Sequence, residues 1–285
     1  MNESDKRPKS RKTKMLIVFA VFIVIAIIAF LFINPLTGNP VSKLLVKNTA
    51  RAYVSDTYSA LDLQLERVAY NFKDGCYYAH FTSPDNVDIH FAVSADGWGK
   101  LLSDDYESHV TSGWNTAMRL DQEYRALVNT VLETDNFPYV CDIGYGELLY
   151  ENFSVPVDTT DCLNMASLEI GKNYDVAELA ETYGHLTIYI DSDTVTVENA
   201  AGILLQLKQL LDHADVPFFS IDFTLQYPRS EEDGARLGEA VMVLGFPYED
   251  IHTDGMAERV QTAYEAALAY YAERDAIKGA EATEW

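Results

Sequence analysis

The sequence predicts an α+β protein: one N-terminal transmembrane helix followed by two extracellular α+β domains. Three observations lead to this fold class. They are an uninterrupted apolar run near the N-terminus, segments in which apolar and polar residues alternate, and segments in which apolar residues recur every three or four positions. We expect a basic cytoplasmic tail (1–14), the transmembrane helix (15–33), a membrane-proximal domain (34–134) and a C-terminal domain (135–285).

The apolar run Met15–Ile33 predicts the membrane span. Its nineteen residues include no charge, Pro, Gly or amide side chain. At about 1.5 Å per residue, a helix of this length crosses the hydrocarbon core of a bilayer. The run is longer than the apolar part of a secretory signal peptide and ends without a small-residue cleavage site, which favours an uncleaved signal anchor. The lipid bilayer is therefore an expected partner of residues 15–33.

The charges on the two sides of this run predict its orientation. The tail carries six Lys or Arg and two acidic residues, a net +4, so a chain of net −23 leaves −27 for the remainder. The positive-inside rule then predicts a single-pass protein of the cell membrane, with its N-terminus cytoplasmic and its C-terminus extracellular. The acidic surplus argues against nucleic acid as a partner, because phosphates would be repelled.

The chain has three cysteines, Cys76, Cys141 and Cys162, which are too few for a disulfide-built scaffold. Cys141 and Cys162 fall in the same irregular stretch and are the pair best suited to a single disulfide outside the cell. Three free thiols are the alternative. A catalytic thiol is not expected, because no neighbouring His or basic residue supplies the setting that lowers a thiol pKa.

The first domain is predicted to be a helix, an antiparallel meander and a second helix. The first helix runs from Val41 to about Ser59, where apolar residues keep helical spacing. The first strand, 61–72, changes phase near Arg67, which predicts a β-bulge. The remaining elements are strands over 76–82, 87–93 and 98–102 and a long helix over 104–133.

In the second domain, strands and helices are expected to interleave. Asp175 is the predicted N-cap of one helix, and Gly184 is its predicted C-terminal stop. The expected strands cover 148–153, 165–170, 186–190, 219–225 and 237–246, and the expected helices cover 175–183, 197–211 and 255–276.

Two groups of segments resemble a known family. Arg51–Tyr58 and Val68–Tyr78 resemble the N-terminal domain of the YfjL-like proteins of Gram-positive bacteria, and Glu249–Ile251 and Ala269–Asp275 resemble the end of that family's C-terminal domain. The family has no assigned activity, so the resemblance implies a membrane-anchored bacterial protein of similar layout and transfers no catalytic residue. The order of the first domain also resembles cystatin-like and PepSY-like modules, some of which bind or restrain peptidases.

The sequence contains no recognised catalytic motif. A zinc-protease HExxH, a GxSxG elbow and a phosphate-binding glycine loop are all missing, and no cofactor or metal is expected. His80 and His90 lie on adjacent predicted strands, but two imidazoles do not complete a metal site. Acidic clusters are best explained as helix caps and turns, with a cation site or paired carboxylates as alternatives. These clusters are Asp104–Glu107, Asp191–Asp193, Glu231–Asp233 and Glu249–Asp250.

The favoured hypothesis is a membrane-tethered, extracytoplasmic, non-enzymatic protein that binds or regulates another protein or a peptide at the cell surface. A groove or an exposed aromatic patch is the feature expected of such a protein. The alternative is a cell-surface hydrolase that uses carboxylates. It requires two carboxylates facing each other across a cleft, one of them with a raised pKa. Asn152–Ser154 also matches a glycosylation acceptor.

Overall fold

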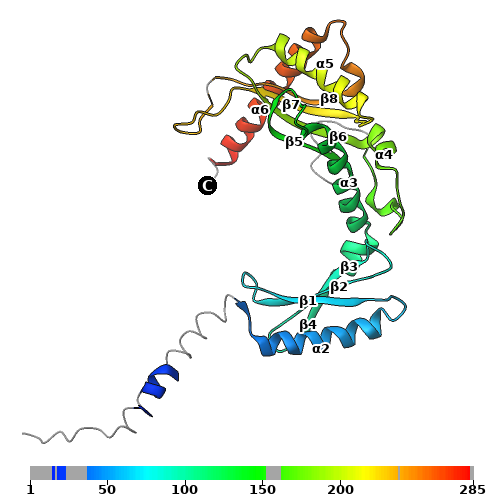
Figure 1. Ribbon diagram of the computed structural model, residues 1–285, viewed down its shortest axis with the longest axis vertical. Coiled ribbons are helices and arrows are strands. Elements are labelled where there is room, and N and C mark those ends of the chain that lie inside the picture. The colour runs from blue at the N-terminus through cyan, green and yellow to red at the C-terminus, as the bar shows by residue number, and fades with distance from the viewer. Residues whose placement is uncertain (1–14, 17, 24–36, 152–161, 237, 283–285) are drawn as a thin grey trace, which may run out of the picture. The chain divides into compact units, whose positions relative to one another are not determined.

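The computed structural model describes residues 15–16, 18–23, 37–151, 162–236 and 238–282. The chain forms two compact units, Met1–Thr111 and Ser112–Trp285 (Figure 1). Both are α+β, and each contains one four-stranded sheet. The division falls earlier than the expected domain end at residue 134, so the helix that follows residue 111 belongs to the second unit.

The structure corrects the prediction of a transmembrane helix. Within the part of the chain that the structure describes, no helix is both long enough and apolar enough to cross a membrane. Residues 17 and 24–33 of the predicted span lie outside the described residues, as does the tail over 1–14. The finding overturns the single-pass span, and with it the cell-membrane location, cytoplasmic N-terminus and extracellular C-terminus that were inferred from it.

The first unit is a helix followed by an antiparallel meander of four strands in sequential order. Helix α2 begins where the Asn39 side chain accepts a hydrogen bond of 2.8 Å from the Val41 amide and Pro40 occupies the first helical position. The elements are α2 (Pro40–Thr57), β1 (Gln64–Asn71), β2 (Cys76–Thr82), β3 (His90–Ala95), β4 (Leu101–Asp104) and the short π-helix η1 (Glu107–Thr111).

The core of this unit lies between α2 and one face of the sheet. Alternate residues of β2 are buried, and residues four apart on α2 pack against them. The buried residues on these two elements are Val46, Ala50, Val54, Tyr77, Ala79 and Phe81. The predicted bulge is confirmed, because the register of β1 on β2 shifts between Leu65 and Arg67.

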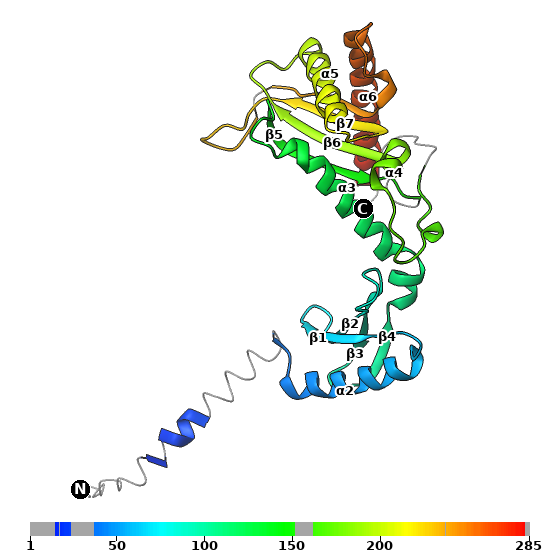
Figure 2. The same cartoon turned by 45° about the vertical axis from the view of Figure 1, so that its right-hand side comes forward.

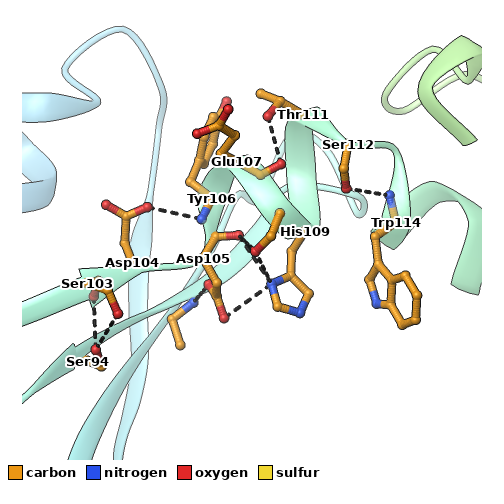
Figure 3. A network of polar contacts seen from close by, with 12 residues as sticks. Ser94, Ser103, Asp104, Asp105, Tyr106, Glu107, His109, Thr111, Ser112 and Trp114 are labelled. Carbon is orange, nitrogen blue, oxygen red and sulfur yellow. Dashed lines mark hydrogen bonds and ion pairs between the residues drawn. The ribbon is translucent and has the colours of Figure 1, made fainter.

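The long helix expected over 104–133 is wrong in its first third. Asp104 ends β4, and its carboxylate accepts the Tyr106 amide at 3.1 Å (Figure 3). The Asp105 carboxylate accepts the Ala92 amide of β3 at 2.5 Å. The Asp105 carboxylate thus stabilises the end of the sheet and the Asp104 carboxylate a turn. The π-helix η1 follows these two residues. Helix α3 starts only after Gly113, whose φ of +80° breaks the chain direction.

The second unit has the sheet order β5-β6-β7-β8, in which β6 and β7 are parallel and the outer pairs are antiparallel. Helix α5 makes the crossover that a parallel pair needs. The elements are α3 (Trp114–Leu132), β5 (Val140–Leu148), η2 (Met165–Ser167), α4 (Val176–Tyr183), β6 (Gly184–Asp191), α5 (Val197–His213), β7 (Ser220–Gln226), β8 (Val241–Pro247), η3 (Tyr248–Asp250) and α6 (Met256–Ala282).

One face of this sheet and the helices α3 and α5 enclose the larger core. Its fully buried side chains alternate along the two central strands and recur at helical spacing on α5. They include Leu186, Ile188 and Ile190 of β6, Ile221, Phe223 and Leu225 of β7, and Leu204, Leu207 and Leu211 of α5.

Strand β5 precedes the strand expected over 148–153. Apolar and polar residues do not alternate in its sequence, because the strand contains two glycines. The packing of α3 explains why glycine occurs there. A Cβ at Gly146 would lie 2.6 Å from a methyl carbon of Val128 on α3. Glycine therefore allows α3 to approach the strand closely. The same glycines remove the alternation of apolar and polar residues by which a strand is predicted. The strand expected over 165–170 is also wrong, because Met165–Ser167 form the short 3-10 helix η2.

Candidate functional site

A groove in the second unit lies between strand β8 and helix α6. Its volume is about 590 Å³, within the range of small-molecule and peptide sites. Helix α6 packs against β8, the last strand of the sheet, and Figures 1 and 2 show α6 passing behind the sheet. The lining residues are Leu244, Gly245, Phe246, Pro247 and Asp250 from β8 and η3, and Gly255, Glu258, Arg259, Thr262, Ala263, Ala266, Ala267 and Tyr270 from α6 and the residue before it.

The floor of the groove is apolar. Phe246 and Ala267 are buried, and Ala263 is half-buried. The alanines leave space that larger side chains would fill, while Val260 on the same helix is fully buried in the core and holds α6 in place. At one end, Tyr270 is 44% exposed. The groove is thus a trough with an apolar floor and an aromatic side chain at one end.

Strand β8 is irregular where it lines the groove. Gly245 has a φ of +56°, and its amide donates a hydrogen bond of 2.6 Å to Oδ1 of Asp222 on β7 instead of joining the regular ladder. The register of β7 on β8 shifts at this point, between Ile221 and Phe223. Such a bulge bends an edge strand and is frequent beside binding sites.

Two other hollows are less suited to an apolar ligand. One of about 640 Å³ lies between the end of α2 and β1, and polar side chains supply about half of its lining, among them Arg51, Ser55 and Asp62. The other, of about 570 Å³, borders α4 and α5 and carries three carboxylates, Glu181, Asp212 and Asp215. Of the three, the groove between β8 and α6 has the most continuous apolar floor.

A Ser–His–Asp arrangement occurs on β6 and β7. His185 Nδ1 lies 2.8 Å from Ser220 Oγ, and His185 Nε2 lies 3.5 Å from Asp222 Oδ1. The geometry resembles a nucleophile with its base and orienting carboxylate. However, Ser220 and His185 are each only 1% exposed, so a substrate has no access to the hydroxyl. We interpret the three residues as an internal polar link between two parallel strands.

One carboxyl group in the second unit has a clearly raised pKa. Burial, with a smaller contribution from the charge of Glu147, raises the pKa of Asp121 on α3 to about 6. The carboxylate accepts the backbone amide of Leu148 at 2.8 Å. Asp121 thereby ties α3 to the end of β5, and neither it nor Glu147 lines the groove.

In the structure, most of the candidate sites that the sequence suggested are not assembled. His80 opposes Ala92 and His90 opposes Thr82, so the two histidines are offset by two positions on neighbouring strands. Among the described residues, no group of three or more His, Cys, Asp or Glu side chains is placed to hold a metal ion. Asn152–Ser154 lie outside the described residues.

Within the part of the chain that the structure describes, Cys76, Cys141 and Cys162 form no disulfide. Their pairing under oxidising conditions stays a prediction. Cys141 lies in β5, and burial raises the pKa of its thiol, which lowers its reactivity at neutral pH.

The acidic clusters have structural contacts of several kinds. Asp104 accepts hydrogen bonds from the hydroxyls of Tyr53 and Tyr58, and Asp233 accepts the Ala235 amide at 3.0 Å within a turn. The helix after Asp193 is capped by Thr196. Asp250 is the exception, because it lies at the groove.

Two family models match the chain over most of its length. The YfjL-like N-terminal domain matches residues 12–110, and the YfjL-like C-terminal domain matches residues 123–261. The chain belongs to the YfjL-like family. Each match falls largely within one compact unit, and the C-terminal match includes β8 and the first part of α6. No activity comes with these matches.

Other comparisons add little to this assignment. No curated protein matches the chain. A crystal structure of a DUF5037 family protein from Ruminococcus gnavus aligns with 76% of this chain and 98% of its own, at 12% identity and a TM-score of 0.23. A similarity at this score carries no conclusion about fold or function.

Proposed function

We propose that this YfjL-like protein is a non-enzymatic binding protein that holds a short segment of another protein, or a peptide, in the groove between β8 and α6. The observation that carries the proposal is the apolar trough itself, with its buried Phe246 and Ala267 and its exposed Tyr270. Aromatic and small apolar surfaces of this kind are characteristic of sites that bind side chains of a partner.

The position of the groove favours a peptide over a compact ligand. Strand β8 is an edge strand, and edge strands present backbone N–H and C=O groups on the side away from the sheet. An extended segment can pair with such groups while its side chains occupy the trough. The groove is also open along the helix from Gly255 to Tyr270, about four turns, and so suits an elongated ligand.

The carboxylate hydrolase receives less support from the same contacts. The carboxyl with the raised pKa, Asp121, accepts a backbone amide and lies away from the groove. Asp250 and Glu258 both line the groove, but the raised pKa that this hypothesis requires of one carboxyl belongs to Asp121. We therefore do not propose a catalytic role for this site.

Photo-crosslinking at single positions tests the proposal. A benzoylphenylalanine placed at Ala266, which is exposed and lines the groove, should crosslink a discrete partner in cells that produce the full chain. The same probe at Leu268, which is exposed on α6 but does not line the groove, is the control. Identical crosslinks from both positions, or none from Ala266, would refute the proposal.

A further inference from the structure

We infer that the ligand of this groove is a peptide segment in which apolar side chains adjoin a lysine or arginine, whose cationic group lies against Asp250 and Glu258. This inference rests on the proposed binding function and specifies the class of peptide. It follows from which charged groups at the groove are already engaged and which are not.

Arg259, the cationic residue in the lining, is held by the protein itself. Its guanidinium donates to the carbonyl oxygens of Asp250 at 2.8 Å, Asp254 at 2.5 Å and His252 at 2.7 Å. These bonds close the loop that precedes α6 and direct the charge of Arg259 toward that loop. A carboxylate or phosphate on a ligand would have to compete with three charge-assisted hydrogen bonds.

The acidic groups at the same end remain exposed to a ligand. Glu258 is exposed and lies over Gly255, where its Oε2 is 3.9 Å, and Nη1 of the internally bonded Arg259 is 3.5 Å, from the position that a Cβ of Gly255 would occupy. Asp250 is half-buried, at the end of η3. Two carboxylates with one internally bonded guanidinium give this end of the groove a negative potential. The net charge of −23 on the chain reinforces that potential at long range.

The other end of the groove is aromatic, which gives the site a direction. Tyr270 packs edge-on against Tyr271, with ring centroids 5.4 Å apart, and the Arg274 guanidinium lies 4.6 Å from the centroid of the Tyr271 ring. The Arg274 guanidinium is also 4.0 Å from the Asp275 carboxylate, so the groups of the groove lining that attract a cation are the carboxylates of Asp250 and Glu258. The ligand should therefore place its basic residue near the start of α6 and its apolar residues toward Tyr270.

Charge argues against other classes of ligand. An acidic peptide, a nucleic acid or an anionic lipid surface would bring negative groups to Asp250 and Glu258, and the unfavourable interaction would be strongest at low salt. A purely apolar segment would fill the trough but leave the two carboxylates without a partner. The cationic apolar peptide satisfies both parts of the lining.

A selection from a phage-displayed library of random dodecapeptides, with the full chain as target, tests the inference. We expect enriched peptides to combine aliphatic or aromatic residues with at least one Lys or Arg, and their binding to weaken as salt is raised. Ala266→Trp, which fills the groove at an exposed position, should raise the Kd at least about tenfold. Thr262→Trp, a second exposed groove position, serves the same purpose if the first variant does not fold.

The charge variants separate this inference from the proposed function. Glu258→Gln should raise the Kd about two- to fivefold, the range for an exposed ion pair. Asp135→Asn, at an exposed position outside the groove, should leave it unchanged. Peptides that are blocked by Ala266→Trp but lack basic residues and ignore Glu258→Gln would overturn the inference and leave the proposed function standing. If no enriched peptide is blocked by Ala266→Trp, both are overturned.

Discussion

Replacing Asp121 by Asn should make the second unit less sensitive to pH. Burial raises the pKa of this carboxyl from 3.8 to about 6 in the folded chain, so the folded state holds the proton more tightly than the unfolded state. Its contribution to stability is fully present below about pH 3.8 and is lost as the pH rises through about 6. The asparagine side chain can still accept the Leu148 amide but never carries the charge.

The magnitude follows from the two pKa values. A change from 3.8 to about 6 corresponds to roughly 3 kcal/mol over the whole titration. Both pH 5 and pH 7.5 lie above the sequence pI of 4.4. Between these two pH values, the change in pKa corresponds to about 1.4 kcal/mol of the free energy of unfolding. The free energy of unfolding of Asp121→Asn relative to the parent should therefore increase by about 1.4 kcal/mol between these two pH values.

Urea unfolding at pH 5 and pH 7.5 measures this difference. Trp98 belongs to the other unit, so a background of Trp98→Phe and Trp285→Phe leaves Trp114 to report on the unit that contains Asp121. Asp135→Asn removes an exposed carboxylate of the same unit and is the matched control. If Asp121→Asn and the parent showed the same pH dependence, the argument that burial raises this pKa would fail.

Three further substitutions test the packing of the second unit by thermal or urea unfolding. Gly113→Ala should destabilise it by at least about 2 kcal/mol, since φ is +80° and a Cβ would lie 2.0 Å from the Met165 carbonyl oxygen; a wild-type melting temperature would contradict this. Gly202→Ala should stabilise it by about 0.5–1 kcal/mol, because this exposed position within α5 has open space for a methyl group; a loss of stability would count against that. Ser220→Ala should cost about 1–3 kcal/mol by leaving His185 Nδ1 without its bond, yet leave peptide binding intact; a binding defect would reopen a functional role for Ser220.

Strongly periodic segments were predictable from the sequence. Strand β2 matches the expected 76–82, and α4 begins after its predicted cap, Asp175. These elements bury one face each, so the pattern of their side chains follows from their own geometry. Family membership was also anticipated from short strings such as Arg51–Tyr58, and the two family matches confirm it.

Segments whose form depends on a distant partner were not predictable. Strand β5 contains glycines because α3 packs against it, and residues 104–111 leave the helical pattern because Asp105 bonds to β3. Gly184 follows the last residue of α4, as predicted, but it has a φ of −72° and also begins β6, and its missing Cβ makes room for the Tyr124 hydroxyl. In each case a neighbour far along the chain sets the local conformation.

The predicted membrane span shows a different limit. The apolar run Met15–Ile33 has the composition of a span, but composition specifies how favourable burial would be and not which surroundings provide it. The structure contains no spanning helix among its described residues. Length and hydropathy alone were an insufficient basis for the location.

The sequence by itself determined the α+β class, the elements with a clear period and the family, because these depend on contacts close along the chain or on short strings of residues. The groove was decided only by the tertiary structure. Its alanines were readable as a helical stripe, Ala263 and Ala267, but that stripe looks the same whether it faces a core or an open trough. Which it faces depends on where β8 ends and where Val260 anchors α6, and both are set by packing across the whole unit.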